Sequence, residues 1–167
     1  HSEIKSVCMG RNGCVVMATS YGEVAVIDGD MVRNLLVHDS RDFDFRKVMV
    51  RGDVIVLLSR DGRMLFVDDR DGSICRILDL TDADVRSAKG VGRQRTERSD
   101  EVFSHMAELG NCFFVGSRRA IFRVDVANPR SQSKVLAEIA VPADISCMYA
   151  MDDVVRVHLD NGKCMEI

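Results

Sequence analysis

The hydrophobic positions of this chain fall in short runs that are separated by polar turns rich in Gly, Asn and Asp. Residues 59–80, "SRDGRMLFVDDRDGSICRILDL", show the pattern clearly. Two turn signals, Asp61-Gly62 and Asp71-Gly72, lie between apolar runs that are too brief for a helix. Runs rich in Val, Ile and Phe that are bounded by such turns predict antiparallel strands joined as hairpins.

The same hairpin pattern recurs four times along the chain. The four hairpins are "CVVMATSYGEVAVID" (14–28), "VIVLLSRDGRMLFVD" (54–68), "CFFVGSRRAIFRVD" (112–125) and "VVRVHLDNGKCMEI" (154–167). Their starts lie 40, 58 and 42 residues apart. The middle spacing is the longest because residues 82–101, "DADVRSAKGVGRQRTERSDE", form an insertion between two repeats.

Further strands extend each hairpin into a larger sheet. A strand precedes every hairpin, at 6–9, 47–50, 104–107 and 146–149, and a fourth strand follows three of them, at 32–38, 74–80 and 134–141. Four short strands in about 40 residues is the spacing of a β-propeller blade. Runs such as "VIVLL" and "CFFV" are apolar on both faces, as expected of strands covered on both sides.

The sequence therefore predicts an all-β fold of propeller-type repeats, with three full blades and a partial fourth in one domain, 1–167. The predicted repeats are 4–38, 45–80, 102–141 and 145–167. The fourth repeat stops before its fourth strand, so two arrangements remain open. The blades form a minimal four-bladed ring, or they form about half of a larger ring that a second chain or further sequence completes. An incomplete sheet has an open edge that can pair with another strand, so we expect association through the terminal blades, a homo-oligomer included.

The second repeat resembles the repeats of WD-type propellers. Ser59-Arg60-Asp61-Gly62 matches the Ser-x-Asp-Gly turn of that family, and the Asp that ends the third strand is present three times, as Asp28, Asp68 and Asp125. The residue before that Asp is Ile27, Val67 or Val124 where the family has Trp, and the opening Gly-His pair is missing. The resemblance implies a propeller that lacks the His–Ser–Trp hydrogen-bond network of the family. It also implies a rigid platform that binds other proteins.

Composition excludes several classes of function. The net charge of −3 argues against a general nucleic-acid or membrane-surface binder. No apolar run approaches the roughly 18–20 residues that cross a bilayer, and no signal-peptide pattern is present, so we expect no membrane association. No CxxC pair occurs among the six cysteines, and most of them lie in strand-like runs, which predicts reduced core thiols and an intracellular protein, cytoplasmic or nuclear.

Catalytic and metal-binding motifs receive no support from the chain. The acidic segment "DDRDGS" (68–73) resembles part of a calcium loop, but aligning Gly72 with the loop glycine puts Val67 and Leu78 at ligand positions. An acidic turn is the favoured interpretation. His105 and His158 lie in strand-like runs and are predicted to be packed or edge residues. Without a nucleophile motif or a phosphate loop, we expect no enzyme activity and no cofactor.

The insertion carries the clearest functional signal. Its basic residues are Arg86, Lys89, Arg93, Arg95 and Arg98, against one acid within 86–98, Glu97. The segment has almost no apolar residues with which to form a core of its own. Three interpretations remain: a solvated loop, an arm that binds acidic peptides or nucleic-acid phosphates, or a regulatory segment phosphorylated at Thr96 or Ser99.

Arg118-Arg119 occupies the turn of the third repeat at the position where the second repeat has Asp61-Gly62, and adds to this basic character. The sequence as a whole predicts a non-catalytic protein-interaction scaffold within an intracellular multiprotein assembly. The five basic residues of the insertion and Arg118-Arg119 are its predicted partner-binding residues. The alternative is a nucleic-acid-associated module that binds phosphate through residues 86–98.

Overall fold

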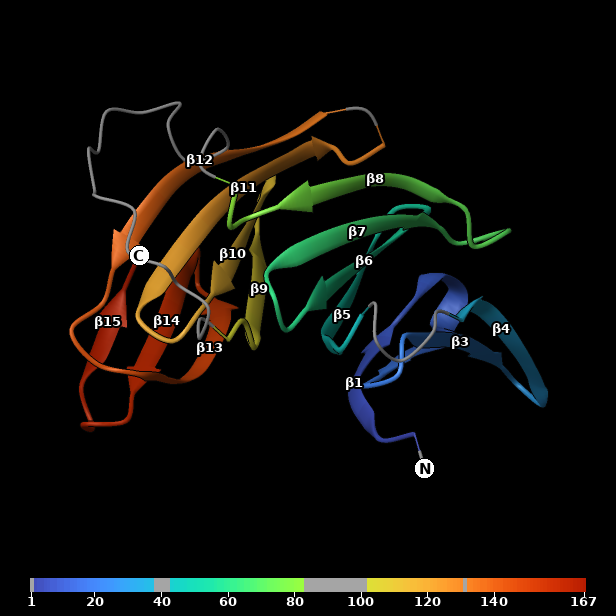
Figure 1. Ribbon diagram of the computed structural model, residues 1–167, viewed down its shortest axis with the longest axis horizontal. Coiled ribbons are helices and arrows are strands. Elements are labelled where there is room, and N and C mark those ends of the chain that lie inside the picture. The colour runs from blue at the N-terminus through green and yellow to red at the C-terminus, as the bar shows by residue number, and fades with distance from the viewer. Residues whose placement is uncertain (1, 38–42, 83–101, 131) are drawn as a thin grey trace.

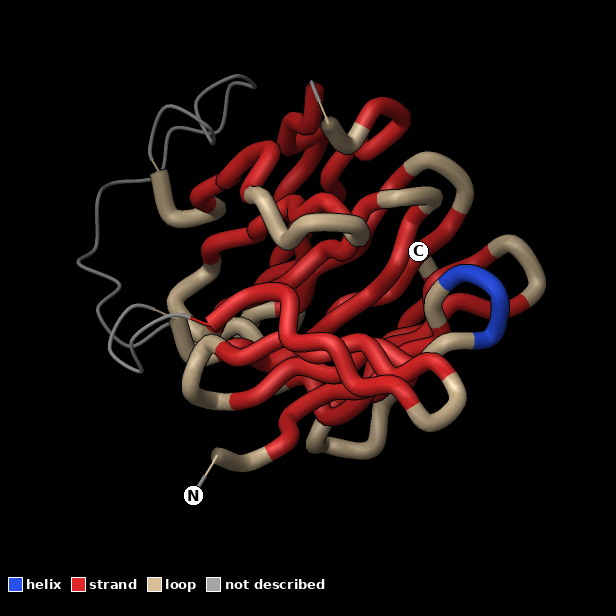
Figure 2. Tube along the Cα trace, turned by 90° about the vertical axis from the view of Figure 1, so that its right-hand side faces the viewer, coloured by secondary structure: helices blue, strands red, loops and turns tan. Residues whose placement is uncertain are grey.

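The computed structural model describes residues 2–37, 43–82, 102–130 and 132–167, and it is built almost entirely of strands (Figure 1). The described helical structure is one short 3-10 turn, Arg11–Gly13, which is blue in Figure 2. Every sheet is antiparallel, and its strands follow one another in chain order. The predicted all-β fold of propeller blades is confirmed.

The first two blades are complete four-stranded sheets. Blade 1 contains β1 (Ile4–Met9), β2 (Val15–Thr19), β3 (Glu23–Asp28) and β4 (Met31–Val37). Blade 2 contains β5 (Phe45–Arg51), β6 (Val54–Ser59), β7 (Arg63–Asp68) and β8 (Ile74–Asp79).

The third blade is complete and the fourth has three strands. Blade 3 contains β9 (His105–Leu109), β10 (Cys112–Gly116), β11 (Ala120–Asn128) and β12 (Gln132–Ala140). Blade 4 contains β13 (Ile145–Met151), β14 (Val154–Leu159) and β15 (Cys164–Glu166). The predicted pattern of three full blades and a partial fourth is confirmed.

The blades follow one another in an arc. The innermost strands are the first of each blade, and contacts join β1 to β5, β5 to β9 and β9 to β13. Blades 1 and 4 lie at the two ends of the arc in Figure 1. A single sheet cannot bury both of its faces alone, and radial stacking lets one blade cover the next.

Three apolar clusters fill the spaces between successive blades. Strand β6 shows why the blades stack, because all of its six residues are buried. Its Ile55 and Leu57 point toward blade 1, whereas Val56 and Leu58 point toward blade 3. A strand buried on both faces has no polar alternation, and this explains the continuous apolar runs in the sequence.

The Ser-x-Asp-Gly turn of blade 2 is closed by its own side chains. The Ser59 hydroxyl donates to the carboxylate of Asp61 and accepts the Arg63 N–H at 3.1 Å. Gly62 has φ +91°, and a Cβ there would lie 2.5 Å from the ring of Phe103. The turn therefore requires glycine both for its backbone conformation and for its packing.

The propeller has two rims. The connection rim carries the turn between the second and third strands of each blade, together with the links between blades. There Leu80 N donates to Gly62 O at 3.0 Å and Phe103 N to Arg60 O at 2.9 Å. The hairpin rim, at the other end of the strands, carries the turns between first and second strands and between third and fourth strands.

The acidic segment 68–73 is a turn of the hairpin rim, as predicted, and joins β7 to β8. The Asp68 carboxylate accepts the Arg70 N–H at 2.8 Å, and the Asp71 carboxylate accepts the Ser73 N–H at 2.9 Å. Within the described ranges, no three His, Cys, Asp or Glu side chains are grouped as a metal site would require. Nor do those ranges contain a helix of the length and hydropathy needed to cross a bilayer.

The cysteines correct one detail of the prediction. All six are unpaired, as expected, but Cys112 alone is buried and both Cys147 and Cys164 are exposed on blade 4. The prediction of core positions is therefore wrong for the blade 4 thiols, because their side of blade 4 has no further described blade against it. Burial raises the pKa of Cys8 to about 11, so this thiol stays protonated and unreactive at neutral pH.

Candidate interaction site

The predicted basic residues of the insertion, Arg86, Lys89, Arg93, Arg95 and Arg98, lie outside the described residues, as do Thr96 and Ser99. Arg118 and Arg119 form a turn of the connection rim, where Val141 N and Ile145 N donate to their carbonyl groups. Both guanidinium groups bind one carboxylate: Arg118 Nε lies 2.5 Å from Asp144 Oδ2, and Arg119 Nε lies 3.1 Å from Asp144 Oδ1.

The Arg118 guanidinium, with Arg119 beside it, lowers the pKa of Asp144. The two arginine side chains remain 69% and 70% exposed, so this is a solvated cluster. One of its two positive charges is balanced locally. The described part of the basic patch is therefore weaker than the sequence suggests.

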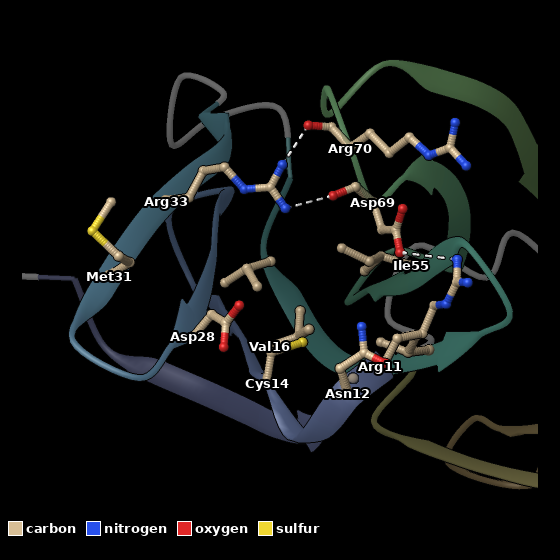
Figure 3. Close-up of a pocket in the computed structure, with 13 residues that line it drawn as sticks. Arg11, Asn12, Cys14, Val16, Asp28, Met31, Arg33, Ile55, Asp69 and Arg70 are labelled. Atoms are coloured by element: carbon tan, nitrogen blue, oxygen red, sulfur yellow. Dashed lines mark hydrogen bonds and ion pairs between the residues drawn. The ribbon is translucent and has the colours of Figure 1, made fainter.

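The hairpin rim contains a pocket of about 520 Å³ between blades 1 and 2 (Figure 3). Its floor is apolar, and consists of Val16, Val26, Val50 and Ile55. Its edge is charged and polar, with Arg11, Asn12, Asp28, Arg33, Asp69 and Arg70. An apolar floor with a few polar groups at the edge is the usual composition of a ligand site.

The arginines at the edge of the pocket are engaged or point elsewhere. Arg33, on β4, donates through Nη2 to the Asp69 carbonyl at 2.8 Å and through Nη1 to the Arg70 carbonyl. Arg11 Nη1 lies 4.0 Å from Asp69 Oδ2. The guanidinium of Arg70 extends away from the pocket in Figure 3. The carboxylate of Asp28, in contrast, has no hydrogen-bond or ion-pair partner among the described residues.

The link made by Arg33 is repeated between the next two blades. Arg76, at the same place in the fourth strand of blade 2, donates through Nη2 to the Ser133 carbonyl of blade 3 at 2.8 Å. Each arginine thus joins the fourth strand of one blade to the last hairpin of the following blade. Sequence reasoning missed this link, although aligning "VRNLL" (32–36) with "CRILD" (75–79) places the two arginines together.

A different arginine fills the space between blades 2 and 3 at this rim. Arg130 Nη2, from the last turn of blade 3, lies 2.7 Å from Asp53 Oδ2 and 2.6 Å from Asp68 Oδ2 of blade 2. Its guanidinium lowers the pKa of Asp53. The pKa of Asp68 is also lowered, first by the Arg70 N–H and then by Arg130.

The pocket between blades 1 and 2 corresponds to a position between blades 2 and 3 that a side chain fills. Asp28 and Asp68 each end the third strand of their blade. Asn12 and Asp53 each lie in the turn between first and second strands. Between blades 2 and 3 Arg130 occupies the equivalent position, whereas between blades 1 and 2 the pocket is open and Asp28 lacks a partner among the described residues.

Solved structures with the same arrangement of strands are numerous. The computationally designed Ika4 protein is 16% identical with a TM-score of 0.71, and the match covers 100% of this chain and 91% of that chain. The Neurospora crassa Pan2 WD40 domain is 11% identical with a TM-score of 0.71, covering 99% of this chain and 46% of that one. BBS1N in complex with ARL6DN is 15% identical with a TM-score of 0.71, and the match covers 99% of this chain and 50% of that chain.

The chain has the β-propeller fold of these structures, with four blades of which the last has three strands. It spans about half the length of the Pan2 and BBS1N chains that it matches. No protein-family model matches the sequence, and no curated protein matches it either. At these low identities the likeness concerns the fold alone, so the function of the propeller rests on its own side chains.

The Arg130 cluster predicts that the propeller becomes less stable in acid. The folded-state pKa values of Asp53 and Asp68 are below their unfolded-state values. Their contribution to stability is therefore complete above about pH 4 and is lost as pH falls through the folded pKa values. Urea unfolding at a series of pH values measures this loss. The variant D53N/D68N, which keeps the hydrogen-bond acceptors, should show a flatter acid limb, and an equally steep limb would contradict the assignment.

Proposed function

We propose that this WD-repeat-like propeller is a non-catalytic protein-interaction scaffold of an intracellular multiprotein assembly, and that the pocket between blades 1 and 2 binds a basic side chain of a partner. The observation that supports this occupant is a contact within the chain itself. Arg130 already fills the equivalent position between blades 2 and 3, where it bridges two blades through the carboxylates of Asp53 and Asp68.

The groups around the pocket favour an arginine side chain as the occupant. Asp28 supplies a carboxylate without a described partner, and the side-chain amide of Asn12 supplies a further acceptor. The apolar floor receives the methylene groups of the incoming side chain, while its guanidinium group stays near the edge. A planar guanidinium can bind a carboxylate through two N–H groups, which gives this contact its direction.

The connection rim offers a second protein-binding surface under the same proposal. It comprises Arg118 and Arg119 and the basic residues of segment 86–98, and it would bind acidic segments. The open edge of β15 is a further place for a partner strand. The nucleic-acid alternative depends on residues 86–98. The described residues favour it less, because Arg118 and Arg119 share Asp144.

A peptide-display library selected on the immobilised propeller tests the pocket. We expect enriched peptides to contain arginine, and D28N to weaken their binding by at least about tenfold through the loss of a charge-assisted contact. Titration calorimetry of synthetic peptides gives the affinities. The matched control is D125N, because Asp125 holds the corresponding place in blade 3 and caps Ala127 N at 3.0 Å.

Two results would redirect the proposal. Equal affinity of the D28N and unaltered proteins would remove the pocket from the function. Salt-dependent retention on heparin that disappears when the five basic residues of 86–98 are replaced by serine would favour the nucleic-acid module.

A further inference from the structure

The first turn of blade 1 places a positive charge at the edge of the pocket. This turn has three residues, Arg11–Gly13, between the last paired residues Gly10 and Cys14. The corresponding turns of the other blades have two residues each, at 52–53, 110–111 and 152–153. None of these shorter turns contains a basic residue, whereas Arg11 lines the pocket.

The guanidinium group of Arg11 is held loosely. Among the described residues its one side-chain partner is Asp69, whose carboxylate lies 4.0 Å from Arg11 Nη1. The Arg11 side chain is 55% exposed, and an exposed ion pair at this distance contributes little. Arg33, in contrast, is fixed by two backbone carbonyl groups. Arg11 is therefore the arginine of the pocket edge that can turn toward an incoming carboxylate.

The unpartnered carboxylate of Asp28 lies at a different part of the edge. Figure 3 shows it well apart from the Arg11 guanidinium, with Val16 and Cys14 between the two charged groups. The pocket thus has a carboxylate on one side of its apolar floor and an available guanidinium on the other. Opposite charges at two separate places are complementary to a ligand that also carries both charges.

The filled position between blades 2 and 3 differs in this respect. There Arg130 meets two carboxylates, Asp53 and Asp68, and the turn that contains Asp53 has no arginine. In blade 1 the corresponding turn supplies the uncharged amide of Asn12 in addition to Arg11. The pocket therefore has one carboxylate fewer and one guanidinium more than the position that Arg130 fills.

The charges around the pocket favour a ligand with no net charge. The guanidinium of Arg70 points away, so two arginines and two aspartates remain at the edge, and their charges balance. An arginine side chain alone would add one uncompensated positive charge. A carboxylate next to that arginine restores the balance, and electrostatic complementarity of this kind gives specificity.

We propose that the pocket binds an arginine that has a carboxylate next to it in the partner's sequence, with the guanidinium on Asp28 and the carboxylate on Arg11. This inference rests on the proposed function and adds the chemical class of the peptide. Two sources provide such a carboxylate: the C-terminus of a partner that ends in arginine, or an acidic residue that follows arginine. In both, guanidinium and carboxylate groups pair through charge-assisted hydrogen bonds.

Two pairs of synthetic peptides test the proposal. The first pair is acetyl-Ala-Ala-Arg with a free C-terminal carboxylate and the same peptide with a C-terminal amide. The second pair is the amides acetyl-Ala-Ala-Arg-Glu and acetyl-Ala-Ala-Arg-Gln. NMR titration of the ¹⁵N-labelled protein gives dissociation constants even for weak binding. We expect a peptide with the carboxylate to bind at least about fivefold more tightly than its neutral match, and the pair that shows the preference identifies the source.

Substitutions at both ends of the pocket assign the two contacts. Arg11→Gln should weaken the preferred peptide to the level of its neutral match, and Arg11→Glu should reverse the preference. Asp28→Asn should weaken all four peptides, because all contain arginine. Arg60→Gln is the matched control: Arg60 is an exposed arginine of the connection rim that bonds through its backbone, so the variant removes the same charge away from the pocket.

The possible failures of the two proposals are distinguishable. Equal affinity within both pairs, with all peptides weakened by Asp28→Asn, would overturn this inference and leave the arginine site in place. A preference that survives Arg11→Gln would also overturn it, because another group would then bind the carboxylate. Binding that is absent, or that does not respond to Asp28→Asn, would remove the arginine site and this inference together. Circular dichroism establishes that each variant is folded.

Discussion

Replacing Phe103 with alanine should lower the free energy of unfolding by about 3–5 kcal/mol, the largest single-residue effect that we expect. Phe103 is fully buried, and its ring centroid lies 5.6 Å from that of Phe122. The ring also fills the space above Gly62 in the Ser-x-Asp-Gly turn. Two hydrogen-bonded blades hold the walls of the resulting cavity apart, so the cavity cannot collapse. Urea unfolding followed by circular dichroism measures the loss.

Phe103→Leu is the control for this prediction. Leucine retains most of the buried apolar volume, so the cost should be below about 2 kcal/mol. If alanine and leucine were equally destabilising, the loss of the aromatic shape at this position, rather than the cavity, would account for the lower free energy of unfolding. A loss below about 1 kcal/mol for alanine would mean that Phe103 is not part of the core.

Gly72→Ala should reduce stability by about 2–4 kcal/mol through two effects that act at the same residue. Gly72 has φ +75°, where an L side chain is strained. A Cβ would also overlap the carbonyl oxygen of Leu35, on β4 of the neighbouring blade. Because this atom belongs to the backbone, the turn must move away from blade 1. The Asp69 and Arg70 carbonyls that accept the Arg33 guanidinium then move with it.

Gly29→Ala separates the two effects. Gly29 also has positive φ, +56°, but no atom lies within 4 Å of the place that a Cβ would occupy. This variant should lose only the backbone contribution, about 1 kcal/mol. Thermal and urea unfolding of both variants give the difference, which is the steric part. Similar losses for the two glycines would show that the contact between Gly72 and Leu35 is not rigid.

Most strands of this propeller could be predicted from local pattern. The turn Asp71-Gly72 and the runs on each side of it specify a hairpin without reference to any other repeat. The repeat spacing then gives the blade, because a four-stranded sheet needs neighbours on both faces. The insertion is also visible, since residues 82–101 interrupt both the spacing and the apolar pattern.

The candidate site could be predicted only in part. Arg118 and Arg119 were recognised by aligning the turn of the third repeat with that of the second, but their shared partner Asp144 lies 26 and 25 positions away. The pocket and the Arg130 cluster were not found at all. Arg130 and Asp53 are 77 positions apart and come from different blades, so no periodic pattern connects them.

The sequence by itself determined the strands, their turns and their grouping into blades, because these depend on side-chain alternation and turn chemistry between near neighbours. Only the tertiary structure decided which charges have partners and which sheet faces are covered. Arg130 fills the gap between blades 2 and 3, whereas the Asp28 carboxylate between blades 1 and 2 has no partner among the described residues. Val7 of blade 1 is exposed, whereas Val48 of blade 2 is buried. These outcomes depend on how the blades pack against one another. The pattern of residues within one repeat carries no information about that packing.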